Sequence, residues 1–117
     1  MEEIKENEYV RLRNGDVTKV KAINEKTFKC KFHKVNCELF IDCIVKHSSN
    51  IIDLIEIGDF VNGRLVLAVD YKNKNVCLLI PLTDTKANTN IMWYGYEDIK
   101  TVVTKEQFAL AEYRLEE

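Results

Sequence analysis

The sequence predicts a mainly β domain, of the β-rich α+β class, with one helix near its C-terminus. Apolar and polar residues alternate with a period of two in several short segments, turn-forming residues separate these segments, and a helix-capping signature precedes the last apolar run. A chain of 117 residues with 46% hydrophobic residues has the size and composition of one domain with its own core. We therefore expect residues 1–117 to form a single domain.

The strongest alternation lies in residues 27–33, where apolar or cysteine residues take turns with basic ones. Successive side chains of a strand point to opposite faces, so this pattern predicts a half-buried strand. The two faces would carry Phe28, Cys30 and Phe32 towards the core, and Lys29, Lys31 and His33 towards solvent.

Two further strands are predicted ahead of this one. Residues 9–13 alternate, residues 14–16 (Asn-Gly-Asp) supply turn chemistry, and residues 17–23 are rich in β-branched side chains. Residues 24–26 then form a short hairpin loop. The three strands would make a meander.

A similar arrangement recurs about 48 residues later, since residues 63–80 follow the pattern of residues 15–32. The pattern indicates two similar meanders, over about residues 8–47 and 58–103; two ordinary hairpins explain it equally well. Residues 76–81 are apolar on both faces, which is typical of a central strand covered on both sides.

The segment between the meanders holds another strand, over residues 38–45, followed by a short helical turn over residues 51–54. Residues 48–50 (Ser-Ser-Asn) offer an N-cap for that turn, and Gly58 a stop. A strand is the alternative over residues 51–54.

The C-terminal third begins with a polar surface loop over residues 83–90. An aromatic-rich strand over residues 91–96 leads into residues 98–103. Residues 113–115 alternate and predict a short closing strand.

One helix is expected over residues 104–112. Thr104 suits the N-cap, Gln107 the reciprocal position of a capping box, and Val103 can pack on Phe108 as a hydrophobic staple. The elements together predict six to eight short strands arranged as SH3-like meanders or a partly open small barrel, with one C-terminal helix.

The sequence carries no sign of export or membrane insertion. The N-terminal segment lacks a basic region followed by an apolar one, and no apolar run approaches the roughly 20 residues that span a bilayer. We therefore expect a cytoplasmic protein without membrane partners, and reduced cysteines at Cys30, Cys37, Cys43 and Cys77.

Residues 9–16, 44–63 and 103–108 resemble stretches of small uncharacterised proteins encoded by phages and prophages of low-GC Gram-positive bacteria. The resemblance implies a short accessory protein in a bacterial cytoplasm that binds host or phage components. Some such proteins inhibit host defence systems, in the manner of anti-CRISPR proteins, although this step is analogy alone. The family has no established catalytic residues that could be carried over.

No motif supports catalysis, a metal or a cofactor. The spacing of Cys30, His33, Cys37, Cys43 and His47 matches no standard zinc site, and Cys30 shares the inward side of its strand. We favour packing or surface roles for these residues. The phosphate-binding and dinucleotide-binding glycine motifs are both absent, so we expect neither an enzyme nor a cofactor.

The charge distribution is uneven. Residues 9–36 carry eight basic and two acidic residues, whereas the whole chain has a net charge of −2 and a pI of about 5.8. Alternation predicts one basic outer face that meets nucleic-acid phosphates or an acidic protein. Its residues would be Arg11, Arg13, Lys19, Lys21, Lys29 and Lys31. A merely solvated sheet face is the commoner explanation, because nucleic-acid-binding domains usually have a high pI.

Trp93, Tyr94 and Tyr96 form a second candidate surface, because tryptophan and tyrosine are enriched at binding hot spots. We favour the alternative that Trp93 and one tyrosine fill the core. The sequence thus leaves two functions open: a binding protein that acts on a host or phage protein, and a nucleic-acid-binding module that uses the basic face. It does not indicate the oligomeric state.

Overall fold

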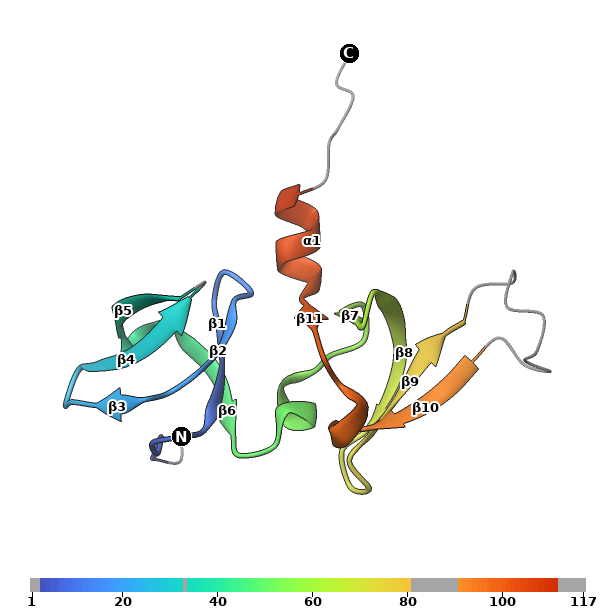
Figure 1. The fold of residues 1–117 in the computed structure, drawn as a ribbon, viewed down its shortest axis with the longest axis horizontal. Helices are drawn as coiled ribbons and strands as arrows, with labels where there is room; N and C mark the ends of the chain where they lie inside the picture. Colours follow the sequence, from blue (N-terminus) through green and yellow to red (C-terminus); the bar gives the residue numbers. More distant parts are fainter. Residues whose placement is uncertain (1–2, 33, 81–90, 112–117) are drawn as a thin grey trace, which may run out of the picture. The chain divides into compact units, whose positions relative to one another are not determined.

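The computed structural model describes residues 3–32, 34–80 and 91–111, and these residues are mainly β, with open sheets and one short C-terminal helix (Figure 1). The predicted fold class is confirmed. The contacts of the chain divide it into two compact units, Met1–Ile55 (unit 1) and Glu56–Glu117 (unit 2). None of the helices in the described ranges is long and apolar enough to cross a bilayer.

Unit 1 contains two three-stranded antiparallel sheets, with the orders β2-β1-β6 and β3-β4-β5. Its strands are β1 (Tyr9–Leu12), β2 (Val17–Lys19), β3 (Ala22–Ile23), β4 (Thr27–Phe32), β5 (Val35–Phe40) and β6 (Ile44–Ser48). Two 3₁₀ turns accompany them, η1 (Ile41–Cys43) and η2 (Ile51–Leu54).

The strand expected over residues 17–23 is divided into β2 and β3. Val20, between them, is fully buried. Its N–H donates to the Glu8 carbonyl and its carbonyl accepts from the Asn7 N–H, both at 2.8 Å. The chain bends at Val20 and passes from one sheet to the other, which a segment rich in β-branched residues does not indicate.

The single strand predicted over residues 38–45 is also wrong. β5 begins earlier, at Val35, and ends at Phe40, where η1 separates it from β6. β4 and β5 form a tight hairpin in which Lys34 has a φ of +70°. A lysine with positive φ gives none of the usual glycine or asparagine signals of a hairpin turn.

Unit 2 is one five-stranded antiparallel sheet with the order β10-β9-β8-β7-β11. Its strands are β7 (Phe60–Val61), β8 (Arg64–Asp70), β9 (Asn75–Leu79), β10 (Ile91–Gly95) and β11 (Val102–Val103). The 3₁₀ turn η3 (Tyr96–Asp98) precedes β11, and the helix α1 (Lys105–Ala111) follows it.

The two units repeat one connectivity. Each has a short first strand (β1 or β7), a second segment beside it (β2 with β3, or β8), two more strands in order, a 3₁₀ turn, and a last strand that returns to pair with the first. The register of that last pair is the same, with Tyr9 opposite Ser48 in unit 1 and Phe60 opposite Val103 in unit 2.

A carboxylate turn ahead of the first strand is also repeated. The Lys5 N–H donates to Glu8 Oε1 at 2.8 Å, and the Glu56 N–H donates to Asp59 Oδ2 at 2.8 Å. The backbone bonds of Val20 to residues 7 and 8 recur between Val66 and residues 58 and 59. The two units therefore share local hydrogen bonding as well as strand order.

Each unit buries its own apolar side chains. The core of unit 1 contains Ile4, Val10, Leu12, Val20, Phe28, Cys30 and Ile44. Buried apolar residues of unit 2 include Val61, Val66, Val76, Leu78 and Ile80. The alternation predicted for residues 27–32 is confirmed, since Phe28 and Cys30 are buried and Lys29 and Lys31 exposed.

Both predicted caps are confirmed. Asn50 caps η2 by accepting a 3.0 Å hydrogen bond from the Ile52 N–H. At α1, the Thr104 N–H donates to Gln107 Oε1 at 3.1 Å, and the Gln107 N–H donates to Thr104 Oγ1 at 3.3 Å, which is the predicted capping box. The Phe108 ring packs on Phe60, with ring centroids 4.7 Å apart. The polar loop predicted over residues 83–90, the closing strand over 113–115 and the orientation of His33 lie outside the described residues.

Candidate binding surfaces

The sheet of unit 1 has a polar outer face on β4 and β5. Alternation turns Lys29 and Lys31 away from the core, and the antiparallel register places Glu38 opposite Lys29 and Asn36 opposite Lys31. We call this surface, together with the neighbouring Lys21, the polar face. Its residues are Lys21, Lys29, Lys31, Asn36 and Glu38, all of them exposed.

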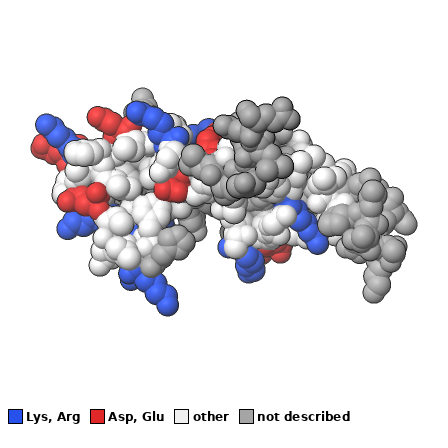
Figure 2. Space-filling model, turned by 90° about the horizontal axis from the view of Figure 1, so that it is seen from above, with Lys and Arg blue, Asp and Glu red and all other residues white. Residues whose placement is uncertain are grey.

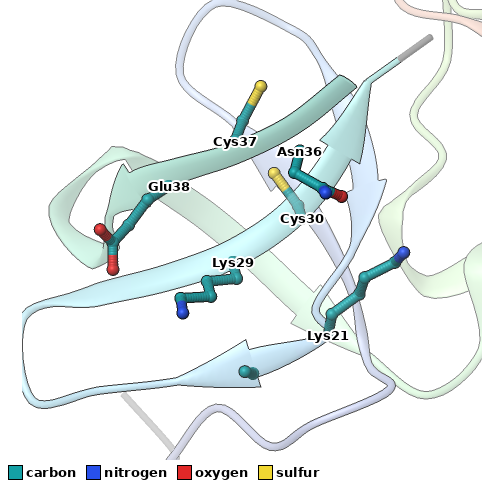
Figure 3. Close-up of a pocket in the computed structure, with 7 residues that line it drawn as sticks. Lys21, Lys29, Cys30, Asn36, Cys37 and Glu38 are labelled. Carbon is teal, nitrogen blue, oxygen red and sulfur yellow. The ribbon is translucent and has the colours of Figure 1, made fainter. Parts of the chain in front are cut away.

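A surface hollow of about 420 Å³ adjoins the polar face. Figure 3 shows six of its lining residues, Lys21, Lys29, Cys30, Asn36, Cys37 and Glu38. The Glu38 carboxylate is held in place because it accepts hydrogen bonds from Thr27 Oγ1 at 3.1 Å and Asn24 Nδ2 at 3.5 Å. The hollow thus combines lysine ammonium groups with one positioned carboxylate.

The prediction that Arg11 projects from a basic face is wrong. Its side chain is 1% exposed, and its Nη1 donates a 3.0 Å hydrogen bond to the Leu54 carbonyl at the end of η2. β1 is the central strand of its sheet, and most of its residues are buried whichever way they point. Alternation therefore does not separate core from solvent in β1.

The other five predicted cations are exposed but belong to different sheets. Arg13 donates from Nη2 to the Asp42 carbonyl at 2.8 Å, and Lys19 lies over the Tyr9 ring at 5.4 Å, both beside the β2-β1-β6 sheet. Lys21, Lys29 and Lys31 lie on or next to the β3-β4-β5 sheet. In the view of Figure 2, basic and acidic residues are interspersed. The six residues do not form one cationic face, and a binding role for any of them stays a prediction.

Unit 2 exposes apolar residues at the outer face of its sheet. Tyr94 and Met92 of β10 pair with the buried Val76 and Leu78 of β9, so the side chains of Trp93 and Ile91 point to the other side. There Trp93 lies opposite Cys77 and Ile91 opposite Leu79. We call Leu67, Leu79, Ile91 and Trp93, with Cys77 buried among them, the apolar face.

The aromatic residues are more exposed than expected. Trp93 is 52% exposed and Tyr96 54%, so the preference for a core role of Trp93 is wrong. Tyr94 is partly buried, and its hydroxyl lies 3.5 Å from Arg64 Nη1. β9 is a central strand as predicted, but Leu79 is 41% exposed, so the expected cover on both sides is wrong for this residue.

The polar face and the apolar face occupy equivalent positions of the two units. Phe28 of β4 pairs with Leu39, and Val76 of β9 pairs with Tyr94, and both Phe28 and Val76 are fully buried. Counting along the strands from these pairs gives the equivalent outer positions. They are Lys29 and Cys77, Lys31 and Leu79, Asn36 and Ile91, and Glu38 and Trp93.

The cysteines show packing roles. All four are free, and Cys30 lies opposite Cys37 on the inward side of the hairpin. Burial raises the pKa of the Cys30 thiol, and a hydrogen bond with the Thr18 side chain opposes this effect only in part. A raised pKa disfavours the thiolate, the form that attacks electrophiles and binds metals.

The described part of the chain contains no group of three or more His, Cys, Asp or Glu residues placed to hold a metal ion. His47 Nδ1 instead lies 3.0 Å from Glu8 Oε1. Comparisons of this chain with protein-family models, with curated proteins and with solved structures find no match.

Of the apolar face, sequence reasoning named only Trp93 as a candidate and missed the other residues. Its signal is present in β9 and β10, because both strands are apolar at consecutive positions rather than alternate ones. We interpreted the pattern in residues 76–81 as burial on both sides, which is the usual meaning of a continuous apolar strand, and in residues 91–96 we favoured core filling by Trp93 and one tyrosine.

Proposed function

We propose that this chain is a non-catalytic accessory binding protein of phage or prophage origin that contacts a host or phage protein through the polar face of unit 1. Each unit would be an SH3-like meander, since each has five consecutive strand segments, with β2 and β3 counted as one, and a 3₁₀ turn before the last. The resemblance of residues 9–16, 44–63 and 103–108 to phage-encoded proteins supports this setting. It favours action in the bacterial cytoplasm and, by analogy, inhibition of a host defence system.

The observation that carries the proposal is the hollow beside the polar face. Concave surfaces with a few positioned polar groups are the usual sites of recognition. Here Lys21 and Lys29 supply positive charge, and Glu38 is fixed by its hydrogen bond with Thr27. A partner with an acidic surface and a hydrogen-bond donor for Glu38 fits this arrangement.

Glu38 favours a protein partner over a nucleic acid. It lies directly opposite Lys29, so a phosphate that approaches Lys29 also meets the Glu38 carboxylate. The repulsion offsets part of the attraction of the lysines.

The alternative function is a nucleic-acid-binding accessory module that uses Lys21, Lys29 and Lys31. The exposure of these lysines on or next to one sheet supports it. This function requires an affinity that falls steeply as salt is raised, because each phosphate contact releases counterions.

The test is a pulldown from lysate of the native host, with mass spectrometry, run with and without nuclease. We expect one protein to be retained after nuclease treatment. In a binding assay with that protein, the K29E/K31E variant should bind at least about 10-fold more weakly, because two attractive charges become repulsive. The K72E/K100E variant makes the same charge change at exposed lysines of unit 2 and should bind as the wild type does.

Retention that disappears with nuclease contradicts the protein-binding proposal and favours the nucleic-acid module. Equal weakening by both charge variants also contradicts it, because the effect would then follow from net charge and not from the polar face.

A further inference from the structure

Two thiols face each other across the β4-β5 hairpin of unit 1. Cys30 and Cys37 are directly opposed in the antiparallel register, and both lie on the inward side of the hairpin. Figure 3 shows the two side chains on adjacent strands, projecting to the same side. The strand pairing therefore sets the distance between the two residues.

That distance suits a disulfide. Directly opposed Cα atoms of an antiparallel pair lie about 4.5–5.5 Å apart, and disulfides join Cα atoms that are roughly 4.4–6.8 Å apart. A bond between Cys30 and Cys37 therefore requires a small approach of their Cβ atoms and no change of strand pairing. The Cys37 Sγ must leave the Val35 carbonyl oxygen, which lies at 3.7 Å, and a thiol is a weak donor that loses little there.

The register selects this pair of cysteines. Among the described strand pairs, only the one between β4 and β5 places two cysteines opposite each other. Cys43 lies in η1, outside the pairing of β4 with β5, and Cys77 belongs to unit 2. Oxidation of unit 1 should therefore join Cys30 to Cys37.

The two thiols differ in their access to solvent. Cys30 is 1% exposed, and burial raises the pKa of its thiol, whereas Cys37 is only partly buried. A reagent in solution therefore meets Cys37 first. Cys30 lies beside it as the second thiol, and an accessible cysteine next to a resolving one is the usual arrangement of a reversibly oxidised site.

We propose that Cys30 and Cys37 are a site of reversible oxidation, at which a low-molecular-weight disulfide converts the two thiols into a bond that locks β4 to β5. The Cys37 thiolate attacks one sulfur of the reagent R–S–S–R, and one RS⁻ leaves as a mixed disulfide forms. The Cys30 thiolate then attacks the Cys37 sulfur, and the second RS⁻ leaves. The protein gives up two protons and two electrons, and the reagent is reduced to two thiols.

The bond acts on the part of unit 1 that carries the polar face. Four residues of that face flank the two cysteines along the strands, namely Lys29, Lys31, Asn36 and Glu38. β5 is the outer strand of its sheet in the described part of the chain, with β4 as its neighbour. Outer strands open by local fluctuation, and a covalent bond to the next strand opposes this opening.

The disulfide does not rest on the function proposed for the polar face. It is measured on the isolated chain, without a partner. A failure of the pulldown therefore leaves this proposal intact, and a failure to form the disulfide leaves the proposed binding function intact.

The test is incubation of the reduced, folded chain with an excess of oxidised glutathione, followed by mass spectrometry under non-reducing conditions. We expect the intact chain to lose two hydrogen atoms and to retain no glutathione. Cleavage after Lys31, Lys34 and Glu38 places Cys30, Cys37 and Cys43 on three different peptides, which identifies the bonded pair. A chain that stays reduced, that stops at the mixed disulfide, or that forms its bond through Cys43 overturns the proposal.

The matched variants are Cys37→Ser and Cys43→Ser, which change two partly buried cysteines packed against the same core. Cys37→Ser removes the attacking thiol and should lower the yield of intramolecular disulfide at least about 10-fold. Cys43→Ser should leave the yield unchanged. An equal loss in both variants contradicts the assignment of the pair. The peptide assignment on the wild type needs no substitution and decides the matter if Cys37→Ser does not fold.

Amide hydrogen exchange measures the locking of the hairpin. In the oxidised chain, amide protons bonded between β4 and β5 should exchange at least about 10-fold more slowly than in the reduced chain. Those between β8 and β9 of unit 2 are the internal control and should not change. Dithiothreitol should restore the original rates. Exchange in β4 and β5 that is the same in both states, or that does not recover on reduction, overturns the proposed reversible lock.

Discussion

The polar face of unit 1 and the apolar face of unit 2 lie at equivalent positions of the same strand connectivity, yet their chemistry is opposite. The inward positions are alike, since Phe28 and Val76 are both fully buried, whereas the outward positions differ, as Glu38 and Trp93 do. The inward side chains must fill a core of fixed shape. The outward side chains are not under this constraint.

The same comparison applies to the hydrogen bonds that both units share. The carboxylate turn, the capped segment after the last strand and the hairpin between the second and third segments each occur in both units, with different residues. Substitutions at these places test whether equivalent hydrogen bonds contribute equally to the free energy of unfolding.

The largest effect is expected for the carboxylate turn of unit 2. Asp59 is fully buried and accepts from the Glu56 N–H at 2.8 Å and the Lys105 N–H at 2.9 Å. Asp59→Ala leaves these donors without their charged acceptor, so the free energy of unfolding should fall by about 3 kcal/mol. The measurement is urea-induced unfolding followed by NMR.

The matched change in unit 1 is Glu8→Ala. The Glu8 side chain is 17% exposed and also lies 3.0 Å from His47 Nδ1, but water can replace it at the exposed Lys5 N–H, so the loss should be about 1 kcal/mol. Asp59→Asn retains an acceptor oxygen and should lie between the two. A larger loss for Glu8→Ala than for Asp59→Ala would contradict the assigned order.

The helix caps should give an intermediate effect. Thr104→Ala removes the acceptor of the Gln107 N–H at the start of α1, and the expected loss is about 1 kcal/mol. Asn50→Ala removes the single cap bond of η2 and should cost no more than Thr104→Ala. Thr104→Ser keeps the hydroxyl and is the control. Far-UV circular dichroism during thermal unfolding measures all three, and a loss for Thr104→Ser equal to that for Thr104→Ala argues against capping as the cause.

The smallest effect concerns pH and the hairpin between β8 and β9. Hydrogen bonds from the Asn73 side chain (2.8 Å) and the Asn73 N–H (3.1 Å) hold the pKa of Asp70 below its usual value of 3.8. The folded state therefore favours the ionised carboxylate. These hydrogen bonds contribute fully to stability at pH values above 3.8.

This contribution is lost as the pH falls through the lowered pKa of Asp70. Asp70→Asn should reduce the dependence of stability on pH in that acidic range and leave it unchanged near neutral pH. In the hairpin of unit 1 over residues 24–26, the Asn24 side chain instead donates to the Thr27 hydroxyl and to the carboxylate of Glu38, which lies on β5, outside the hairpin. Carbon-detected NMR titration of the Asp70 carboxyl checks the direction, and a pKa above 3.8 would contradict it.

Local patterns predicted much of the fold because their causes are local. The alternation of Phe28 and Cys30 with Lys29 and Lys31 identified β4, and the spacing of Thr104 and Gln107 identified the start of α1. A strand or a cap requires only the residues that form it.

Long-range contacts explain the errors. Val20 bends the chain between two sheets, and Arg11 is buried because β2, β6 and η2 surround it. The prediction of one basic face assumed that every alternating strand has one solvent-exposed side. This assumption is wrong for β1, in which residues on both sides are buried.

The sequence by itself determined the mainly β class, the inward positions of β4 and the two caps, because each depends on side chains within a few residues of one another. Only the tertiary structure decided that Arg11 is buried, that Trp93 is exposed, and that the polar face and the apolar face are equivalent surfaces. The physical reason is that burial depends on which distant segment lies against a residue, and a periodic pattern carries no information about that segment.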